Sequence, residues 1–291
     1  MMNKKSCNSL INGIATDHVH IDDRSIHYGD GLFETILCDN NKLYFWQQHF
    51  QRLQASSDRL KLACPDESVL LADISRLLTD RPSANSYVIK VILSRGIGER
   101  GYRFGENSNP TRTVLLSELE ADYSSLLGNT LLEGELFICE QQVSINENLA
   151  GLKHLNRLDN VMARNEWHDK SGNIIDGLML NADQQVIEGT MSNIFAVKEG
   201  QVFTPALHRS GVNGVMREVI VELAAKNNIP LSITDLSLET LLTSDEAFIS
   251  NSLIGMKRVS RITEKKFKQH AITDRLFTEL INVKEEYAQT V

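Results

Sequence analysis

The sequence predicts an α/β protein of two domains, the first of them of the α+β kind. Three observations support this prediction. The chain has 291 residues, which is enough for two domains of ordinary size. Segments rich in β-branched residues alternate with segments of helical periodicity along its whole length. A polar stretch from Glu118 to Gly128 interrupts this pattern. We therefore expect an N-terminal domain over residues 1–120 and a C-terminal domain over residues 121–291.

The first domain is expected to combine a sheet with two helices. The turn signal at Asp39-Asn40-Asn41 separates two apolar runs, as in a hairpin. Apolar residues then recur at spacings of three and four, which is typical of a helix with one buried face. The expected elements are a hairpin over 32–45, helices over 46–60 and 67–78, and strands over 87–93 and 111–117.

The second domain repeats the alternation with shorter strands. Gly211 to Arg217 opens a helix that runs to about Lys226, and an amphipathic helix from about Asp274 closes the chain. A further helix from about Leu155 to Lys170 follows the segment Gly151–Leu155. The expected strands are 136–143, 178–180, 186–187, 192–197, 202–203, 231–234 and 247–249.

Composition narrows the possible functions. The chain is 42% hydrophobic and 23% charged, as in folded globular proteins, which argues against disorder. Its net charge of −8 argues against a general nucleic-acid binder, because such proteins present a basic surface. A local basic pocket for a small anion stays compatible with this charge.

The four cysteines are Cys7, Cys38, Cys64 and Cys139, and no two of them form a CxxC pair. This spacing argues against a zinc site and indicates free thiols in a reducing compartment. The N-terminus lacks the apolar segment of a signal peptide, and no apolar run approaches the ~20 residues of a membrane span. We expect a cytoplasmic protein without a metal or a membrane partner.

Lys153 lies between strand-like residues and a helix start. A solvated surface lysine is the simplest interpretation of such a position. The alternative is a lysine that attacks an aldehyde, which must be neutral part of the time. Partial burial and neighbouring cations lower a lysine pKa, and Arg157, one helical turn away, is a candidate for such a cation.

Glu188 follows two β-branched residues and precedes Gly189. It reads most simply as a strand-end carboxylate that faces water. Its functional alternative is a carboxylate that keeps the ring nitrogen of a cofactor protonated, because a protonated ring accepts electrons better.

The segment Gly211–Arg217 leads into a helix start, where backbone N–H groups and the helix dipole favour a phosphate. It lacks the Gly-Lys-Ser/Thr of a Walker motif, and a plain turn capped by Asn213 is the alternative. Arg52 lies in a helix that faces the core, and its guanidinium suits a phosphate, although an exposed helix residue is the simpler interpretation. Ser252 adds a hydroxyl after a buried strand, which is a weak signal by itself.

The order of these segments along the chain is a stronger signal than any one of them. Five motifs occur in it, namely Asp23-Arg24 with His27–Thr35, then His49–Leu53, Ser94–Tyr102, Gly151–Leu158 and Gly211–Arg217. The first two resemble the opening of fold-type IV pyridoxal-phosphate enzymes, which include the branched-chain and D-amino-acid aminotransferases. The last three resemble more closely the branch that acts on 4-amino-4-deoxychorismate. The resemblance runs from about Ile11 to about Ser260.

The resemblance implies two α/β domains with pyridoxal 5′-phosphate in the cleft between them, in a homodimer whose partner helps to wall the site. Lys153 would form the Schiff base and move protons, and Glu188 would pair with the pyridine nitrogen. The implied phosphate ligands are Arg52, the backbone of Val212 and Asn213, and the Ser252 hydroxyl. Arg157 would lie near the cofactor, where aminotransferase relatives carry a tyrosine. The residues implied to face the substrate are Tyr28, Thr35, Arg95 and Arg100.

The activity implied is a lyase reaction of folate biosynthesis that yields 4-aminobenzoate and pyruvate, with Lys153 or Thr35 protonating the leaving group. An aminotransferase for D- or branched-chain amino acids is the alternative, because it would use the same cofactor residues. A non-catalytic scaffold is a third possibility, which the presence of both Lys153 and Glu188 opposes. Glu34 keeps a carboxylate where we expect variation among such lyases, and this raises a question about substrate recognition.

Overall fold

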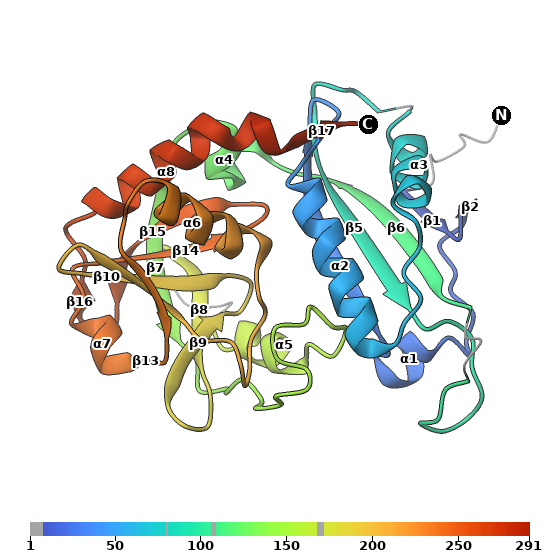
Figure 1. Ribbon diagram of the computed structural model, residues 1–291, viewed down its shortest axis with the longest axis horizontal. Coiled ribbons are helices and arrows are strands. Elements are labelled where there is room, and N and C mark those ends of the chain that lie inside the picture. Colours follow the sequence, from blue (N-terminus) through green and yellow to red (C-terminus); the bar gives the residue numbers. More distant parts are fainter. Residues whose placement is uncertain (1–7, 80, 106–108, 168–171) are drawn as a thin grey trace. The chain divides into compact units, whose positions relative to one another are not determined.

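A computed structural model describes residues 8–79, 81–105, 109–167 and 172–291 (Figure 1). The chain forms two compact units, the first made of residues 1–121, 153–156 and 286–291 and the second of residues 122–152 and 157–285. This division differs from the expected one in two short segments. Lys153–Asn156 and Glu286–Val291 group with the first unit because their backbones pair with strands there. Cys7 lies outside the described residues.

The first unit is built on a sheet that has seven strands among the described residues. Neighbouring strands in it are antiparallel, and β3 pairs with β5 from Gly31↔Ser94 to Asp39↔Ser86 without a shift in register. In spatial order the strands are β17 (Ala288–Thr290), β4 (Lys42–Tyr44), β3 (Gly31–Asp39), β5 (Ser86–Ser94), β6 (Thr111–Glu118), β1 (Ser9–Ile11) and β2 (Ile14–Ala15).

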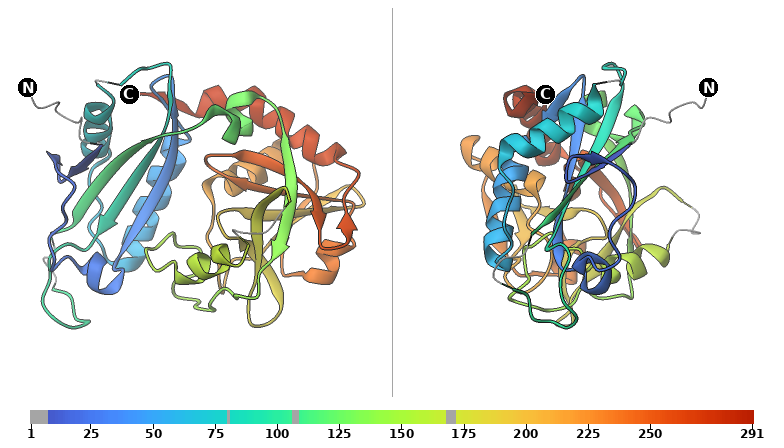
Figure 2. Two further views of the ribbon diagram at one scale, coloured as in Figure 1. Left: turned by 180° about the vertical axis from the view of Figure 1, so that it is seen from behind. Right: turned by 90° about the vertical axis from the view of Figure 1, so that its right-hand side faces the viewer.

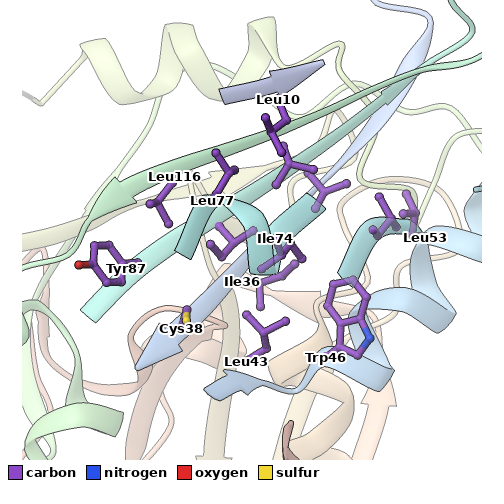
Figure 3. Close-up of a cluster of buried hydrophobic side chains, with 14 of the residues drawn as sticks. Leu10, Ile36, Cys38, Leu43, Trp46, Leu53, Ile74, Leu77, Tyr87 and Leu116 are labelled. Atoms are coloured by element: carbon purple, nitrogen blue, oxygen red, sulfur yellow. The ribbon is translucent and has the colours of Figure 1, made fainter. Parts of the chain in front are cut away.

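Two helices, α2 (Trp46–Leu60) and α3 (Glu67–Leu78), cover one face of this sheet (Figure 2). Their apolar stripes pack on alternate strand residues such as Ile36 and Ile89, which are fully buried. Figure 3 shows this core, in which Trp46 and Ile74 from the two helices meet Ile36 and Leu43 from the strands. The short helix α1 (Arg24–Tyr28) precedes β3, with Asp23 as its N-cap.

The second unit contains a sheet of ten strands among the described residues. Its neighbours are mixed, since β7 lies parallel to both β15 and β8 whereas β10, β14 and β15 are antiparallel. In spatial order the strands are β12 (Leu231–Thr234), β11 (Gln201–Pro205), β10 (Asn193–Lys198), β14 (Glu246–Asn251), β15 (Gly255–Ile262), β7 (Leu132–Ile138), β8 (Ile174–Leu180), β9 (Gln185–Gly189) and β13 (Leu236–Ser237), with β16 (Lys265–Lys266) paired to β15.

Helices α6 and α8 pack against each other and on β14, and residues of β8, β9, β10 and β14 supply much of the apolar core (Figure 1). No helix within the described ranges is long and apolar enough to span a bilayer. The helical elements that lie wholly or mainly in this unit are η1 (Ala121–Tyr123), α4 (Ser125–Gly128), α5 (Leu158–Asn165), α6 (Val215–Lys226), α7 (Leu238–Leu242), α8 (Ala271–Val283) and η2 (Lys284–Tyr287).

The structure departs from the sequence prediction mainly where charged residues occupy strands. No strand was expected over β15, because Lys257, Arg258 and Arg261 break its apolar pattern, yet the side chains of all three are only partly exposed. Strand β7 begins at Leu132 and ends at Ile138, earlier than expected at both ends. Helix α5 begins at Leu158, not Leu155, because the residues before it pair with β3. Its expected end at Lys170 lies outside the described residues.

Candidate active site

Lys153 lies in a segment that is fixed by the start of strand β3. The backbone N–H of Phe33 donates to the Lys153 carbonyl at 3.0 Å, and the N–H of Leu155 donates to the Gly31 carbonyl at 3.0 Å. The segment therefore continues the sheet beside β3. The half-buried Lys153 side chain places its Nζ 4.3 Å from the centroid of the Phe33 ring. The lysine is thus held by backbone hydrogen bonds and by an aromatic ring.

A second lysine contacts the same ring. Lys90 Nζ lies 5.1 Å from the Phe33 centroid, and Lys90 is directly opposite Thr35 in the β3–β5 register. Because alternate residues of a strand share a face, Phe33, Thr35 and Lys90 lie on the face opposite α2 and α3. Lys90 is not among the site residues that the sequence predicted. The signal for it is a single exposed charge inside an otherwise apolar strand.

Glu34 points to the other face, into a buried ionic cluster. Its carboxylate accepts from Arg52 Nε at 2.8 Å, from Arg52 Nη2, and from His49 Nδ1 at 2.6 Å. Glu34 is 2% exposed and His49 is 1% exposed. This answers the question that Glu34 raised in the sequence, because a carboxylate committed to Arg52 and His49 does not face the substrate.

Charge and burial compete in this cluster, which we call the Glu34 cluster (Glu34, His49 and Arg52). Burial by itself would raise the pKa of Glu34, but the Arg52 charge and the His49 hydrogen bond lower it to about 2. Burial also lowers the pKa of His49, against the opposing effect of Glu34. We therefore assign a neutral imidazole that donates through Nδ1. The charge of Lys153 lowers the His49 pKa further, which places the Lys153 ammonium near this cluster.

Arg95 is placed differently from the prediction. It is 3% exposed, and its donors go to the Asp30 carboxylate and to the carbonyls of Leu60 and Lys61 at the end of α2. Its guanidinium also lies 3.9 Å from the centroid of the Phe104 ring. Arg95 therefore ties β5 to α2, and we do not propose it as a substrate ligand.

Tyr28 and Arg24 hold the loop that follows Gly98. The Tyr28 hydroxyl accepts from the Gly101 N–H at 3.0 Å, and Arg24 donates to the carbonyls of Gly101 and Tyr102. These contacts use the loop backbone, and the Tyr102 ring also lies 5.5 Å from the Tyr28 ring, centroid to centroid. Arg100 is exposed, and Tyr102 is 87% exposed.

In the second unit, Glu188 ends strand β9 and is 3% exposed. Its Oε2 accepts from the Val212 N–H at 2.7 Å. Burial lowers the pKa of Arg157, and the negative charge of Glu188 opposes this effect. These two side chains therefore lie near each other. Gly211 is required at the turn before Val212, since its φ is +84° and a Cβ there would lie 2.7 Å from Ile187 Cγ2.

The loop before α6 contains Val212 and Asn213, whose backbone the sequence predicted to bind the phosphate. The Val212 N–H donates to Glu188, and the Asn213 N–H donates to the Gly151 carbonyl at 3.0 Å, so both groups are already engaged. The first N–H groups of α6 have no carbonyl of their own helix to bind. Its N-cap is Gly214, which offers no side chain to cap them. Val215 and Met216 are therefore better placed than Val212 and Asn213 to donate to an anion.

Gly214 and Ser252 are the two remaining residues of interest in this unit. A Cβ on Gly214 would lie 2.0 Å from Asn193 Oδ1, while Asn193 Nδ2 donates to the Val212 carbonyl at 2.9 Å. The loop is thus held against the start of β10. Ser252 is half-buried in the turn between β14 and β15, a turn closed by bonds from the Leu253 and Ile254 N–H groups to Asn251 Oδ1.

A model of the family described as Amino-transferase class IV matches residues 31–262. The chain belongs to this family. Aminotransferase class IV proteins depend on pyridoxal 5′-phosphate. The two-sheet architecture described above is that of the fold-type IV enzymes in this family.

Three relatives place the chain within aminotransferase class IV. It is 37% identical to an aminodeoxychorismate lyase of Vibrio harveyi over 254 residues, which cover 87% of this chain and 90% of the relative. The crystal structure of 4-amino-4-deoxychorismate lyase from Pseudomonas aeruginosa superposes with a TM-score of 0.81 at 33% identity, covering 94% and 99% of the two chains. A D-alanine aminotransferase of Listeria monocytogenes is 28% identical over 244 residues, or 84% and 82% of the two chains.

The residues present fit the family's cofactor. A lysine held on a sheet edge, a buried carboxylate at a strand end, a partly buried arginine and a helix start without a side-chain cap are the donor set that a pyridine ring with a phosphate arm requires. Gly151 lies two residues before Lys153 in the sequence. Its carbonyl accepts from the Asn213 N–H and so binds the loop that contains Val212 and Asn213.

The Glu34 cluster predicts a defined loss of stability. Glu34→Gln should lower the free energy of unfolding by about 3 kcal/mol at neutral pH, because Arg52 stays buried without its counter-charge. The wild-type contribution is present above the unfolded pKa of 4.5 and is lost as the pH falls toward the folded value of about 2. Urea unfolding at neutral and acid pH measures both effects. The exposed Glu118→Gln is the control, and equal stability of the two variants would contradict the prediction.

Proposed function

We propose that this chain is a pyridoxal-phosphate-dependent lyase that converts 4-amino-4-deoxychorismate to 4-aminobenzoate and pyruvate. The observation that carries the proposal is the placement of Lys153 Nζ on the Phe33 ring, with Lys90 on the same ring and Thr35 opposite Lys90. This puts a proton-transferring amine beside a cation and a hydroxyl on one sheet face. The similarity to two lyases over nearly the whole chain favours this activity over the alternatives.

We infer which residues would hold the cofactor. Lys153 would bind it covalently, and the Glu188 carboxylate would face its ring nitrogen. Its phosphate would be held by Arg52, by the Val215 and Met216 N–H groups at the start of α6 and by the Ser252 hydroxyl, and Arg157 lies near Glu188. Glu34 and His49 fix the direction of the Arg52 guanidinium, because two of its nitrogens bind the Glu34 carboxylate.

Proton movement follows from the groups on the Phe33 face. When bound, pyridoxal phosphate supplies an electron sink for the ring carbon that bears the substrate amine. Lys153 Nζ takes the proton from that carbon while the bond from the ring to the enolpyruvyl oxygen breaks. Lys153 Nζ or Thr35 Oγ1 then donates a proton to the enolpyruvyl methylene carbon, which gives pyruvate. The ring left behind is aromatic, and this makes the step irreversible in practice.

The substrate carries two carboxylates, so its recognition requires cations. Lys90 is exposed on the Phe33 face, and Arg100 is exposed on the loop held by Tyr28 and Arg24. We propose these two side chains as carboxylate ligands, in place of Arg95. Tyr28 then affects substrate binding indirectly, because its hydroxyl holds the loop that carries Arg100.

A D-amino-acid aminotransferase remains the alternative, since the Listeria enzyme shares 28% identity with this chain. It would use the same Lys153 and Glu188. The two activities differ in their products, because an aminotransferase exchanges an amino group with a keto acid and releases no 4-aminobenzoate.

The direct test is an assay of the purified holoenzyme with enzymatically prepared 4-amino-4-deoxychorismate. We expect pyruvate and 4-aminobenzoate in equal amounts, and loss of turnover in Lys153→Ala because the base is removed. Incubation with D-alanine and 2-oxoglutarate is the second arm. Release of pyruvate only in that arm, or full lyase turnover by Lys153→Ala, would overturn the proposal.

Lys90 and Arg95 form a matched pair of variants. Lys90→Gln should raise KM about tenfold or more and leave the melting temperature unchanged, because an exposed charge-assisted contact to substrate is lost. Arg95→Gln should instead lower the melting temperature by several degrees, because buried carbonyls lose their donor. Steady-state kinetics and thermal melting measure the two effects. A stable Lys90→Gln enzyme with wild-type KM would rule out the carboxylate role.

We also propose a cytoplasmic homodimer. The described cysteines Cys38, Cys64 and Cys139 are free, as expected in a reducing compartment. One face of α5 exposes Leu158, Val161 and Met162 at 75%, 58% and 56%, an apolar stripe that a partner subunit would cover. Sedimentation should give twice the chain mass of 32.7 kDa, and Val161→Glu should shift it toward one chain mass. A wild-type protein that sediments as a single chain at all concentrations would contradict the dimer.

A further inference from the structure

The second unit contains a cavity of about 260 Å³ that the proposed reaction does not use. It is enclosed by η1, α5, the start of β8, the segment after β9 and the turn between β14 and β15. None of the residues assigned above to the cofactor or the substrate lines it. Its lining residues are Tyr123, Arg164, Trp167, Ile174, Ile175, Asp176, Met191, Ile249, Asn251, Ile254 and Lys257.

Two cations face this cavity, and each rests on an aromatic ring. The Arg164 guanidinium lies 3.6 Å from the centroid of Trp167, and Lys257 Nζ lies 4.8 Å from the centroid of Tyr123. Burial lowers the pKa of Lys257, although nearby Asp122 and Asp176 oppose this effect. Within the described ranges, neither cation forms an ion pair, and the buried Arg164 Nη1 has no hydrogen-bond partner. The two donors are therefore available to an anion.

The one carboxylate in the cavity wall is already committed. Asp176 is 1% exposed and accepts from the hydroxyls of Thr190 and Ser192 as well as from the Gly177 and Thr190 N–H groups. Burial raises the pKa of Asp176, against those hydrogen bonds, so it is a weaker counter-charge than an exposed aspartate. The cavity consequently favours an anion from outside the chain.

The remaining wall determines the shape and polarity of that anion. Ile174, Ile175 and Met191 supply aliphatic surface, and the rings of Tyr123 and Trp167 supply flat surface. An inorganic phosphate would leave this apolar wall unused, whereas an aromatic ring would cover it. One carboxylate offers two oxygens, which matches the two cationic donors.

We propose that this cavity binds a small aromatic monocarboxylate, with its carboxylate between Arg164 and Lys257 and its ring against Tyr123 and Met191. The ligand class follows from the cavity itself and is independent of the reaction. If the proposed function holds, its product 4-aminobenzoate belongs to this class, and the cavity would then sense product.

The chain offers a reporter for this cavity, because it has two tryptophans and only Trp167 lines it; the other, Trp46, is buried in the core of the first unit. Holoenzyme labelled with 5-fluorotryptophan gives one ¹⁹F resonance for each, assigned with a Trp167→Phe variant. Titration with benzoate should shift the Trp167 resonance saturably and leave the Trp46 resonance in place. 4-Aminobenzoate should do the same, and inorganic phosphate should not.

Variants test whether Arg164 and Lys257 bind the benzoate carboxylate. Arg164→Gln and Lys257→Gln should each raise the dissociation constant for benzoate about tenfold, while Lys226→Gln, an exposed lysine at the end of α6, should not change it. An unchanged melting temperature in each variant shows that the fold is kept. No shift of Trp167 at millimolar benzoate, an equal shift in the variants, or a stronger response to phosphate would overturn the proposal. The benzoate result stands whether or not the lyase assay succeeds.

Discussion

The pairing of residues 153–155 with the start of β3 is the interaction on which the candidate site depends. Two backbone hydrogen bonds, at Phe33 and at Gly31, fix the lysine segment as an added edge of the first sheet. The close approach needs Gly31, because a Cβ there would lie 2.9 Å from Leu155 Cδ1 of the lysine segment. Phe33 follows on the strand and presents its ring to Lys153. The position of the reactive amine is thus set by main-chain geometry and by a neighbouring ring, both of which are rigid.

Strand alternation then separates the chemistry into two faces. Phe33 and Thr35 point away from the helices, whereas Glu34 between them enters the core and holds Arg52 through a charge pair. Neighbouring residues of one motif therefore face different surroundings. The same holds for Arg95 and Arg100, which are five positions apart in the sequence. The first is buried and supports the fold through Asp30 and two backbone carbonyls, and the second is exposed on a loop held by its backbone.

Sequence patterns predicted the family and most of the elements, because periodicity and motif order are properties of the chain alone. The α3 bounds, Glu67–Leu78, were predicted without error. What the sequence did not reveal depends on partners distant along the chain. Arg95 looked like a ligand because its acceptors at Leu60 and Lys61 come from another element, and Val212 looked available because its acceptor, Glu188, lies on another strand. Lys90 was missed because a lone lysine in a strand is usually a solvated residue.

The pairing of residues 288–290 with strand β4 of the first sheet has a consequence for the synthesis of the chain. Strand β4 finds its edge partner β17 only when residues 288–290 exist, and the lysine segment joins β3 only after residue 155 has been made. On a ribosome, the second unit has all its strands before the first sheet is complete. The nascent N-terminal half therefore exposes an unpaired strand edge throughout most of translation, which is a target for chaperones that bind extended chains.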